Sequence, residues 1–101
     1  MMLITNSQNV EYFPLKFHLE QNYPNPFKGK TTINYRLPYR SKVRIIVTDF
    51  YGRIVEKLVS EEYDAGIYEV EFNSGDLPEG IYYYQLIAGH YFETKEMVLI
   101  K

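Results

Sequence analysis

Short runs in which apolar and polar residues alternate recur along this chain, and turn-forming residues separate them. In the clearest run, Val43, Ile45 and Val47 occupy alternate positions. Because neighbouring side chains of a strand point to opposite faces, a period of two predicts strands with one buried face. Eleven tyrosines and six phenylalanines, interspersed with Val, Ile and Thr, are typical of half-buried strands. The sequence therefore predicts an all-β fold.

The candidate strands are too many for one sheet. About seven runs qualify, at residues 15–20, 32–37, 42–50, 53–59, 67–72, 83–88 and 91–101. The run 53–59 fits neither period, which predicts a bulge or a short edge strand. A single sheet of this size with one wet face would expose too many aromatic side chains. We therefore predict an immunoglobulin-like β-sandwich of about seven antiparallel strands.

A chain of 101 residues is long enough for one compact domain with one core. Residues 1–12 are polar and carry no clear period, so we expect a flexible tail or linker remnant there and the β-sandwich over 13–101. The stretch LPEGIY at 77–82 resembles a tyrosine corner, so we expect the Tyr82 hydroxyl to bind main chain a few residues upstream. Gly89 should supply the positive φ of the last hairpin.

Two prolines stiffen the segment before the first long run. Pro24 and Pro26 fix φ and lack an N–H, and they push Tyr23 and Asn25 towards extended conformations. Such a segment cannot lie in the middle of a sheet. We expect residues 22–27 to form a kinked crossover between the two sheets, with Tyr23 or Phe27 packed under the edge of the sandwich.

Several classes of function are disfavoured by composition. The formal net charge is −2 and no basic stripe is present, so we expect no nucleic-acid partner. No apolar run approaches the roughly 18 residues of a membrane helix, so we expect no integral membrane segment. Cysteine is absent, which excludes disulfides and thiol nucleophiles. His18 and His90 are far apart in sequence, and we expect neither a metal site nor a cofactor.

The carboxylates and serines also show no pattern that predicts a catalytic site. Asp49, Glu69 and Glu71 are interpreted as strand residues, and the alternation of Glu69 and Glu71 with apolar neighbours is typical of a solvent face. The acidic cluster 61–64 is interpreted as a solvated loop. No serine lies in a G-x-S-x-G elbow. We expect no enzymatic activity.

Tyr83 leaves one binding function open. It is expected on the opposite face of its strand from Tyr82 and Tyr84, where an open ring could stack on sugars. An ordinary tyrosine-lined sheet surface is the favoured interpretation. One alternative function is therefore a non-catalytic extracellular accessory module that binds carbohydrate. Another, which rests on a sequence resemblance and not on Tyr83, is an immunoglobulin-like part of a flagellar hook-capping scaffold.

Three stretches carry a family resemblance. They are LEQNYPNPFKGKTTINYRLP, VRIIVTDFYGRIVEKLV and AGIYEVEFNSGDLPEGIYYYQLIAGHYFETKEMVLIK. Together they resemble the type A C-terminal sorting domain of proteins carried by the bacterial type IX (Por) secretion system, over residues 19–101. Three positions depart from the usual residues of that family: Lys28-Gly29 replaces Asn-Pro, and Glu96 replaces a lysine.

The positions that match the family form a Pro-Asn-Pro-Phe block, a central turn, two Gly-x-Tyr steps, a last hairpin and a terminal motif. They are Pro24, Asn25, Pro26, Phe27, Gly52, Arg53, Gly66, Tyr68, Gly80, Tyr82, Gly89, Lys95, Met97, Val98, Leu99 and Lys101.

The resemblance implies a sorting signal and no cofactor. Such a domain follows a covalently attached cargo on its N-terminal side and is read by the outer-membrane translocon. A sortase-like peptidase commonly removes it, and residues 1–18 are where we expect the cut. The implied location is the periplasm in transit, then the cell surface or the medium. We expect the terminal strand to offer an open edge and its end to a receptor, and removal of residues 96–101 to abolish export.

Overall fold

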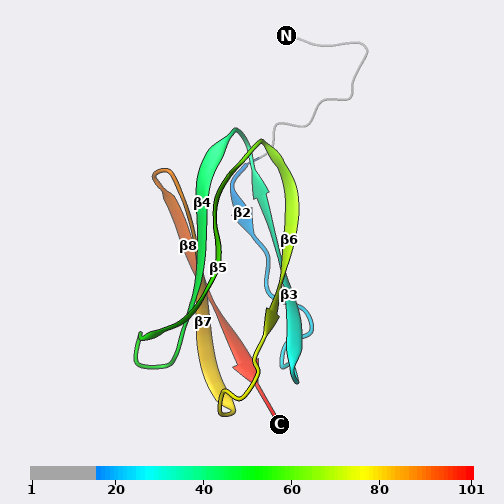
Figure 1. The fold of residues 1–101 in the computed structure, drawn as a ribbon. Helices are drawn as coiled ribbons and strands as arrows, with labels where there is room; N and C mark the ends of the chain where they lie inside the picture. Colours follow the sequence, from blue (N-terminus) through cyan, green and yellow to red (C-terminus); the bar gives the residue numbers. More distant parts are fainter. Residues whose placement is uncertain (1–15) are drawn as a thin grey trace.

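The computed structural model describes residues 16–101, and the expectations for the tail 1–12 and for a domain start at Phe13 lie outside the described residues. All the regular elements of the described part are strands, as the all-β prediction required (Figure 1). They are β2 (His18–Leu19), β3 (Lys30–Leu37), β4 (Ser41–Thr48), β5 (Ile54–Tyr63), β6 (Gly66–Asn73), β7 (Gly80–Ala88) and β8 (Tyr91–Leu99).

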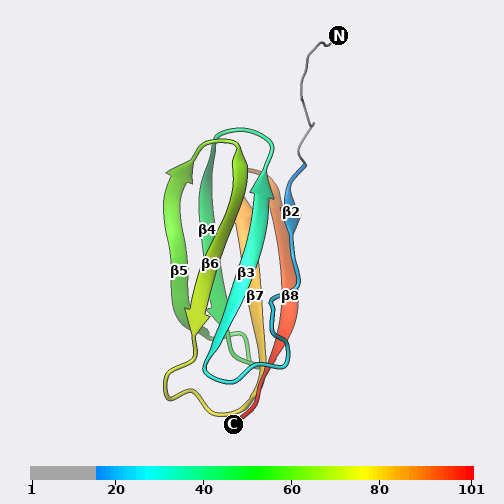
Figure 2. The ribbon, with the colours of Figure 1, turned by 90° about the vertical axis from the view of Figure 1, so that its right-hand side faces the viewer.

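The strands form two sheets that pack face to face (Figure 2). One sheet has the order β2-β3-β6 and the other the order β5-β4-β7-β8, with every ladder antiparallel. The chain changes sheet between β3 and β4 and between β5 and β6 at one end of the sandwich, and between β6 and β7 at the other end (Figure 1). The predicted immunoglobulin-like β-sandwich is confirmed.

Alternation places the core as the sequence predicts. Val43, Ile45 and Val47 of β4 are fully buried, and β4 lies between β5 and β7. Phe72 of β6 faces them from the other sheet and is also fully buried. This inner layer excludes water along the whole length of the sandwich, which is the main source of its stability.

β5 is bulged and lies at an edge, as expected, but it is longer than predicted. The register with β4 shifts between Ile45 and Ile46 and again between Val47 and Thr48. Glu61 and Glu62, assigned to a loop by the sequence, belong to this strand. An edge strand accepts charged residues because its side chains reach solvent. Arg40 binds Glu62 and Asp64 at 3.0 and 2.6 Å, which links the connection between β3 and β4 to the end of β5 and to the connection that follows β5.

Burial disfavours ionisation of three tyrosine hydroxyls. Desolvation by burial raises the pKa of Tyr35 and of Tyr84 from 10.0 to about 12. Burial, together with a hydrogen bond to Glu93, raises the pKa of Tyr91 to about 12. Above pH 10 these phenols therefore ionise in the unfolded chain before they ionise in the folded one.

Alkaline titration tests this arrangement. Stability contributed by the three phenols is complete below pH 10 and is lost as the pH rises through about 12, so unfolding is expected in that window. Phenolate absorbance and far-ultraviolet circular dichroism are followed together, with the denaturant-unfolded chain as control. A folded chain whose tyrosines all ionise in one step near pH 10 would contradict the prediction.

Candidate functional site

Residues 20–27, hereafter the clasp, connect the edges of the two sheets (Figure 2). Tyr23 exchanges two backbone hydrogen bonds of 3.0 Å with Thr32 of β3. Four residues later, the Phe27 amide donates to the Val98 carbonyl at 2.9 Å, and the Phe27 carbonyl accepts from the Ile100 amide at 2.9 Å. Phe27 thus forms a parallel bridge with Leu99. The crossover predicted for residues 22–27 is confirmed.

Of the two aromatic residues expected under the sandwich edge, only one is buried. Phe27 is 1% exposed and lies edge-on to Phe72, with ring centroids 6.0 Å apart. Tyr23 is 81% exposed. Phe27 therefore anchors the clasp in the core, and Tyr23 contributes to it only through its backbone.

A buried polar network fixes the middle of the clasp. The Tyr84 hydroxyl donates to the Glu20 carbonyl at 2.6 Å and accepts from the Asn22 amide at 2.7 Å. The Asn22 side chain donates to Thr31 Oγ1 at 3.0 Å and to the Pro24 carbonyl at 3.1 Å. Asn22 and Thr31 are each 2% exposed, so these groups depend on one another for hydrogen bonds.

The sequence did not reveal these three residues as a unit. Alternation with Tyr82 predicted that Tyr84 lies on the inner face of β7, but it did not predict the hydrogen-bond partners of Tyr84. Nothing in the local sequence pairs Asn22 with a tyrosine 62 positions away. A polar network of this kind is a product of tertiary packing.

The clasp also covers the end of β8. Asn25 Oδ1 accepts a hydrogen bond from the Val98 amide at 2.9 Å, and Gln21 Nε2 donates to the Glu96 carbonyl at 2.7 Å. β8 is an edge strand, as expected, but the expectation that its terminal part offers an open edge is wrong. The proline-rich segment fills that part of the edge, because its own amides and side chains supply the partners.

The central turn is organised by one carboxylate. Asp49 lies just after β4 and not on a strand, and its Oδ1 accepts from the amides of Tyr51 and Arg53 at 2.9 Å each. Arg53 Nε donates to Asp49 Oδ2 at 2.8 Å. Desolvation opposes ionisation, but these hydrogen bonds outweigh it and lower the pKa of Asp49. Gly52 takes a φ of +86°, which only glycine adopts without strain.

The tyrosine corner is present. The Tyr82 hydroxyl donates to the Pro78 carbonyl at 2.6 Å, four residues upstream. Segment 77–82 and the turn 49–53 line a shared groove, and the Lys101 amide donates to Glu79 of that segment at 3.3 Å. Gly80 pairs with Leu99, which Phe27 also contacts.

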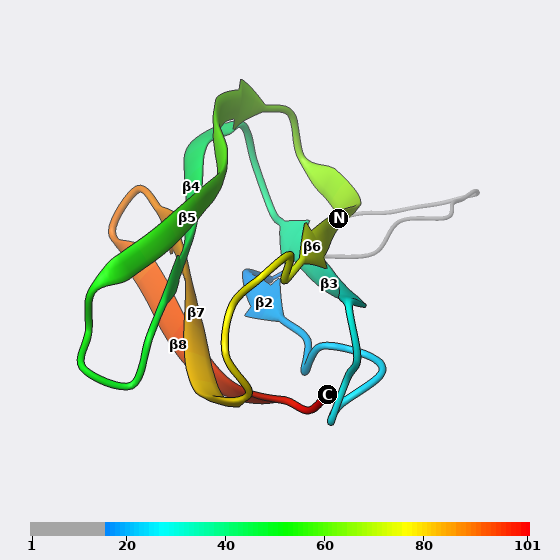
Figure 3. The ribbon, with the colours of Figure 1, turned by 60° about the horizontal axis from the view of Figure 1, so that its bottom comes forward.

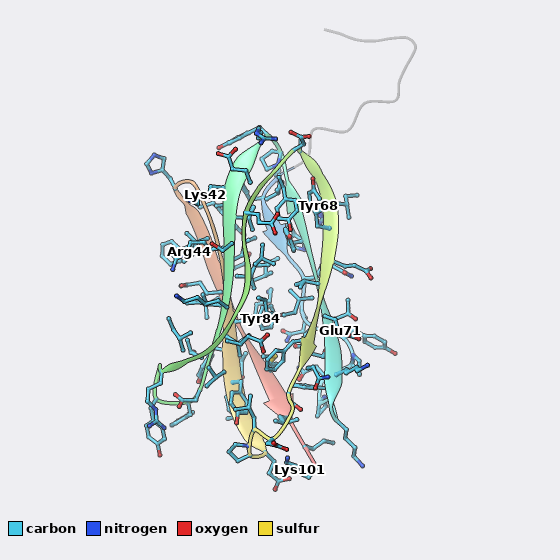
Figure 4. The ribbon with its side chains drawn as sticks, in the orientation of Figure 1. Lys42, Arg44, Tyr68, Glu71, Tyr84 and Lys101 are labelled. Carbon is cyan, nitrogen blue, oxygen red and sulfur yellow. The ribbon has the colours of Figure 1, made fainter. Side chains whose placement is uncertain are left out.

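These contacts gather many of the predicted site residues at one end of the sandwich, hereafter the C-terminal pole (Figure 3). The pole comprises the clasp end 25–27, the chain end 97–101, the turn 49–53 and the segment 77–82. Figure 4 places Lys101 at this end and Tyr68 at the other.

The remaining predicted residues lie elsewhere and have local roles. The Tyr68 hydroxyl donates to the Asp64 carbonyl at 2.7 Å, beside the turn that precedes Gly66, the first residue of β6. Gly89, with a φ of +61°, connects β7 to β8 as predicted. Lys95 lies mid-strand, 3.3 Å from Glu93. A hydrogen bond from the Tyr91 hydroxyl, with help from Lys95, lowers the pKa of Glu93.

Residues 16–101 contain two histidines and no cysteine. Within them, no group of three or more His, Cys, Asp or Glu side chains could hold a metal ion. The same stretch contains no helix that is long and apolar enough to cross a membrane. His18 pairs with Glu20 at 3.3 Å, on the polar face where the sequence placed it.

Replacing Asn22 by alanine tests the network. The change removes the donor to Thr31 and Pro24 in a buried site, so the free energy of unfolding should fall by about 2 kcal/mol. Asn34→Ala, at an exposed position of β3, is the matched control and should change it by less than about 0.5 kcal/mol. Equal denaturation midpoints for the two variants would contradict the role given to Asn22.

Tyr82→Phe tests the corner. Loss of the hydrogen bond to Pro78 should lower the free energy of unfolding by about 1 kcal/mol, measured by denaturant unfolding. Tyr83→Phe, one residue away on the outer face, removes the same atom from a half-buried site and should be nearly neutral. The corner has no stabilising role if Tyr82→Phe unfolds at the wild-type midpoint.

Comparison with known proteins agrees with this geometry. Residues 21–101 match the family described as "Secretion system C-terminal sorting domain". A search of curated proteins gave no match.

Among solved structures, the chain is similar to PorZ of Porphyromonas gingivalis, described as an essential bacterial surface component of the type-IX secretion system. The TM-score is 0.57 at 17% identity, over 84% of this chain and 11% of that one, so the likeness concerns the fold of about a tenth of PorZ. The family match spans most of this sequence, and the chain therefore belongs to the family of secretion system C-terminal sorting domains, the sorting signals of type IX secretion.

Proposed function

We propose that the C-terminal pole is the part of this sorting domain that the outer-membrane translocon recognises. The observation that carries the proposal is the parallel bridge between Phe27 and Leu99. Through it, the Pro-Asn-Pro-Phe block and the terminal motif, which lie at opposite ends of the family match, become one surface. A receptor that contacts this surface reads both blocks at once.

Rigidity supports the same proposal. Main-chain groups of Glu96, Val98 and Ile100 are each bound by the clasp. Fixing a segment before it binds reduces the conformational entropy that binding must remove. Ile100 and Lys101 follow the last buried residue, Leu99, and are exposed, so they are available for contact while the core holds the strand in place.

The attached cargo and the processing step are part of the proposal. The domain directs a cargo joined on its N-terminal side through the periplasm to the cell surface or the medium, and a sortase-like peptidase separates the two. The folded part is already anchored at Phe17, whose ring stacks on Tyr91 at 4.8 Å and meets Tyr39 edge-on at 5.3 Å. A cut on the N-terminal side of Phe17 would therefore leave the sandwich intact.

We further infer that the domain is not an enzyme. The carboxylates with lowered pKa values, Asp49 and Glu93, are occupied by the turn and by Tyr91 and Lys95. Tyr83 lies half-buried between Thr48 and Glu96 in the cross-strand register, which does not favour the sugar-stacking alternative.

A secretion assay tests recognition at the pole. Removing residues 96–101 would delete Met97 and Leu99, which are 0% and 1% exposed, so that truncation would also damage the core. Removing only Ile100 and Lys101 keeps every buried residue of β8. We expect a fluorescent protein with a Sec signal, followed by the 101-residue chain, to reach the surface or medium of a host with an active type IX system. The shortened chain should remain in the periplasm.

Two controls make the result decisive. His90→Ala, an exposed change at the opposite end of the sandwich, should be exported like the wild type. A strain without the translocon should export neither the wild-type fusion nor the His90→Ala fusion. Export of the shortened chain at the wild-type level would refute recognition at the pole. Retention of the wild-type fusion in the periplasm of the active host would refute the sorting function itself.

A further inference from the structure

The outer faces of the two sheets differ in chemistry. Half of the outward positions of β4, β7 and β8 carry apolar or aromatic side chains, namely Ile46, Ile81, Tyr83, Ile87, Phe92 and Val98. The outward positions of β3 and β6 carry only Ile67, among charged and polar residues. One face of the sandwich is therefore much more apolar than the other, although neither is covered by another element of the described chain.

The apolar side chains form a strip along β7 and β8 that the hydrogen-bonded Gln85 and Thr94 interrupt at its middle, and Ile46 beside them is only 9% exposed. Ile87 lies directly opposite Phe92, and Ile81 lies directly opposite Val98, in the register of β7 with β8. Phe92 is 67% exposed, which is unusual for a ring on a strand. Exposed apolar patches mark interaction sites in soluble proteins.

Charges of both signs border the strip at opposite corners. Arg44 of β4 lies in the row of Ile87 and Phe92, and Glu96 of β8 lies in the row of Thr48 and Tyr83. Neither side chain forms an ion pair with any residue in 16–101. Figure 4 shows Arg44 and Lys42 pointing away from the other sheet, on the side opposite Glu71.

The register makes this surface self-complementary. The midpoint between Arg44 and Glu96 falls at Gln85 of β7, which binds Thr94 at 3.0 Å. A two-fold axis that lies in the plane of the face, passes through Gln85 and runs perpendicular to the line from Arg44 to Glu96 places Arg44 of one copy over Glu96 of the other. The reverse contact follows by symmetry. The same operation lays one apolar strip across the other. The two strand directions then cross steeply, which is one of the two ways in which sheets pack.

We propose that the outer face of β4, β7 and β8 is a dimer interface that receives a second copy of this chain. Self-complementarity in charge and in apolar surface favours this occupant over an anionic membrane, since the whole chain carries a net charge of −2. Three strands spaced by about 4.8 Å give a face of roughly 25 by 15 Å. Two such faces bury roughly 750 Å² in total, less than the roughly 1,200 Å² at which stable specific interfaces begin, so the dimer is weak and transient, with a dissociation constant on the order of 100 µM.

Sedimentation of the 101-residue chain tests the proposal, over about 10 µM to 1 mM protein and at low and high salt. We expect a reversible monomer to dimer equilibrium that weakens as salt increases. Arg44→Glu and Glu96→Lys should each weaken dimerisation by about tenfold or more, because each places like charges together twice. Glu71→Lys, a charge reversal at an exposed strand position of the other face, should leave the equilibrium unchanged.

Mixing the two variants gives the sharpest result. A chain with Arg44→Glu and a chain with Glu96→Lys have opposite charges at both corner contacts, so an equimolar mixture should recover the dimer that each has lost alone. Unchanged unfolding midpoints establish that the exposed substitutions preserve the fold.

Three outcomes would overturn the proposal. They are a monomer at every concentration, a dimer that is insensitive to both corner charges, and a mixture that does not recover. A monomer at every concentration would mean that the strip binds a different partner. A dimer that is insensitive to both charges would mean that the interface lies on another surface.

Discussion

The two hydrogen bonds of the Tyr84 hydroxyl determine the position of the clasp. This hydroxyl lies in the core of the four-stranded sheet and binds the backbone of Glu20 and Asn22, which connect β2 to the rest of the clasp. Asn22 then holds Thr31 and Pro24, and the chain leaves in the direction that brings Phe27 to β8. Tyrosine suits this position because its ring fills apolar space in the core, whereas its buried hydroxyl needs hydrogen-bond partners.

This constraint joins the two ends of the domain. Loss of the network would free the clasp, and with it the backbone partners of Val98 and Ile100. The end of β8 would then become an exposed strand edge, which is a risk for unintended pairing with other chains. The clasp therefore has two physical effects: it presents the terminal residues in one geometry, and it covers the edge that the terminal strand would otherwise expose.

Period-two patterning was enough to predict the strands, the inner residues of β3, β4 and β6, and the two-sheet architecture. It failed for Glu61 and Glu62, because charge alone does not distinguish a loop from a solvent-exposed edge strand. The tyrosine corner was predictable because its hydrogen bond spans only four residues. The hydrogen bonds from Asn22 to Tyr84 and from Val98 to Asn25 were not predictable. Each joins positions more than sixty residues apart, and their proximity depends on the completed fold.

The positions expected from the family resemblance are not equivalent once they are placed in the structure. Phe27, Met97 and Leu99 are at most 1% exposed and belong to the core, and the Tyr82 hydroxyl is bound within its own corner. Arg53 and Lys101 are exposed at the C-terminal pole. Under the proposed recognition at the pole, a substitution at a buried position would act on export through stability, whereas a substitution at an exposed one would act on contact with a receptor. A family motif in a small sandwich therefore records folding and recognition together, and only measurement of both stability and export can separate them.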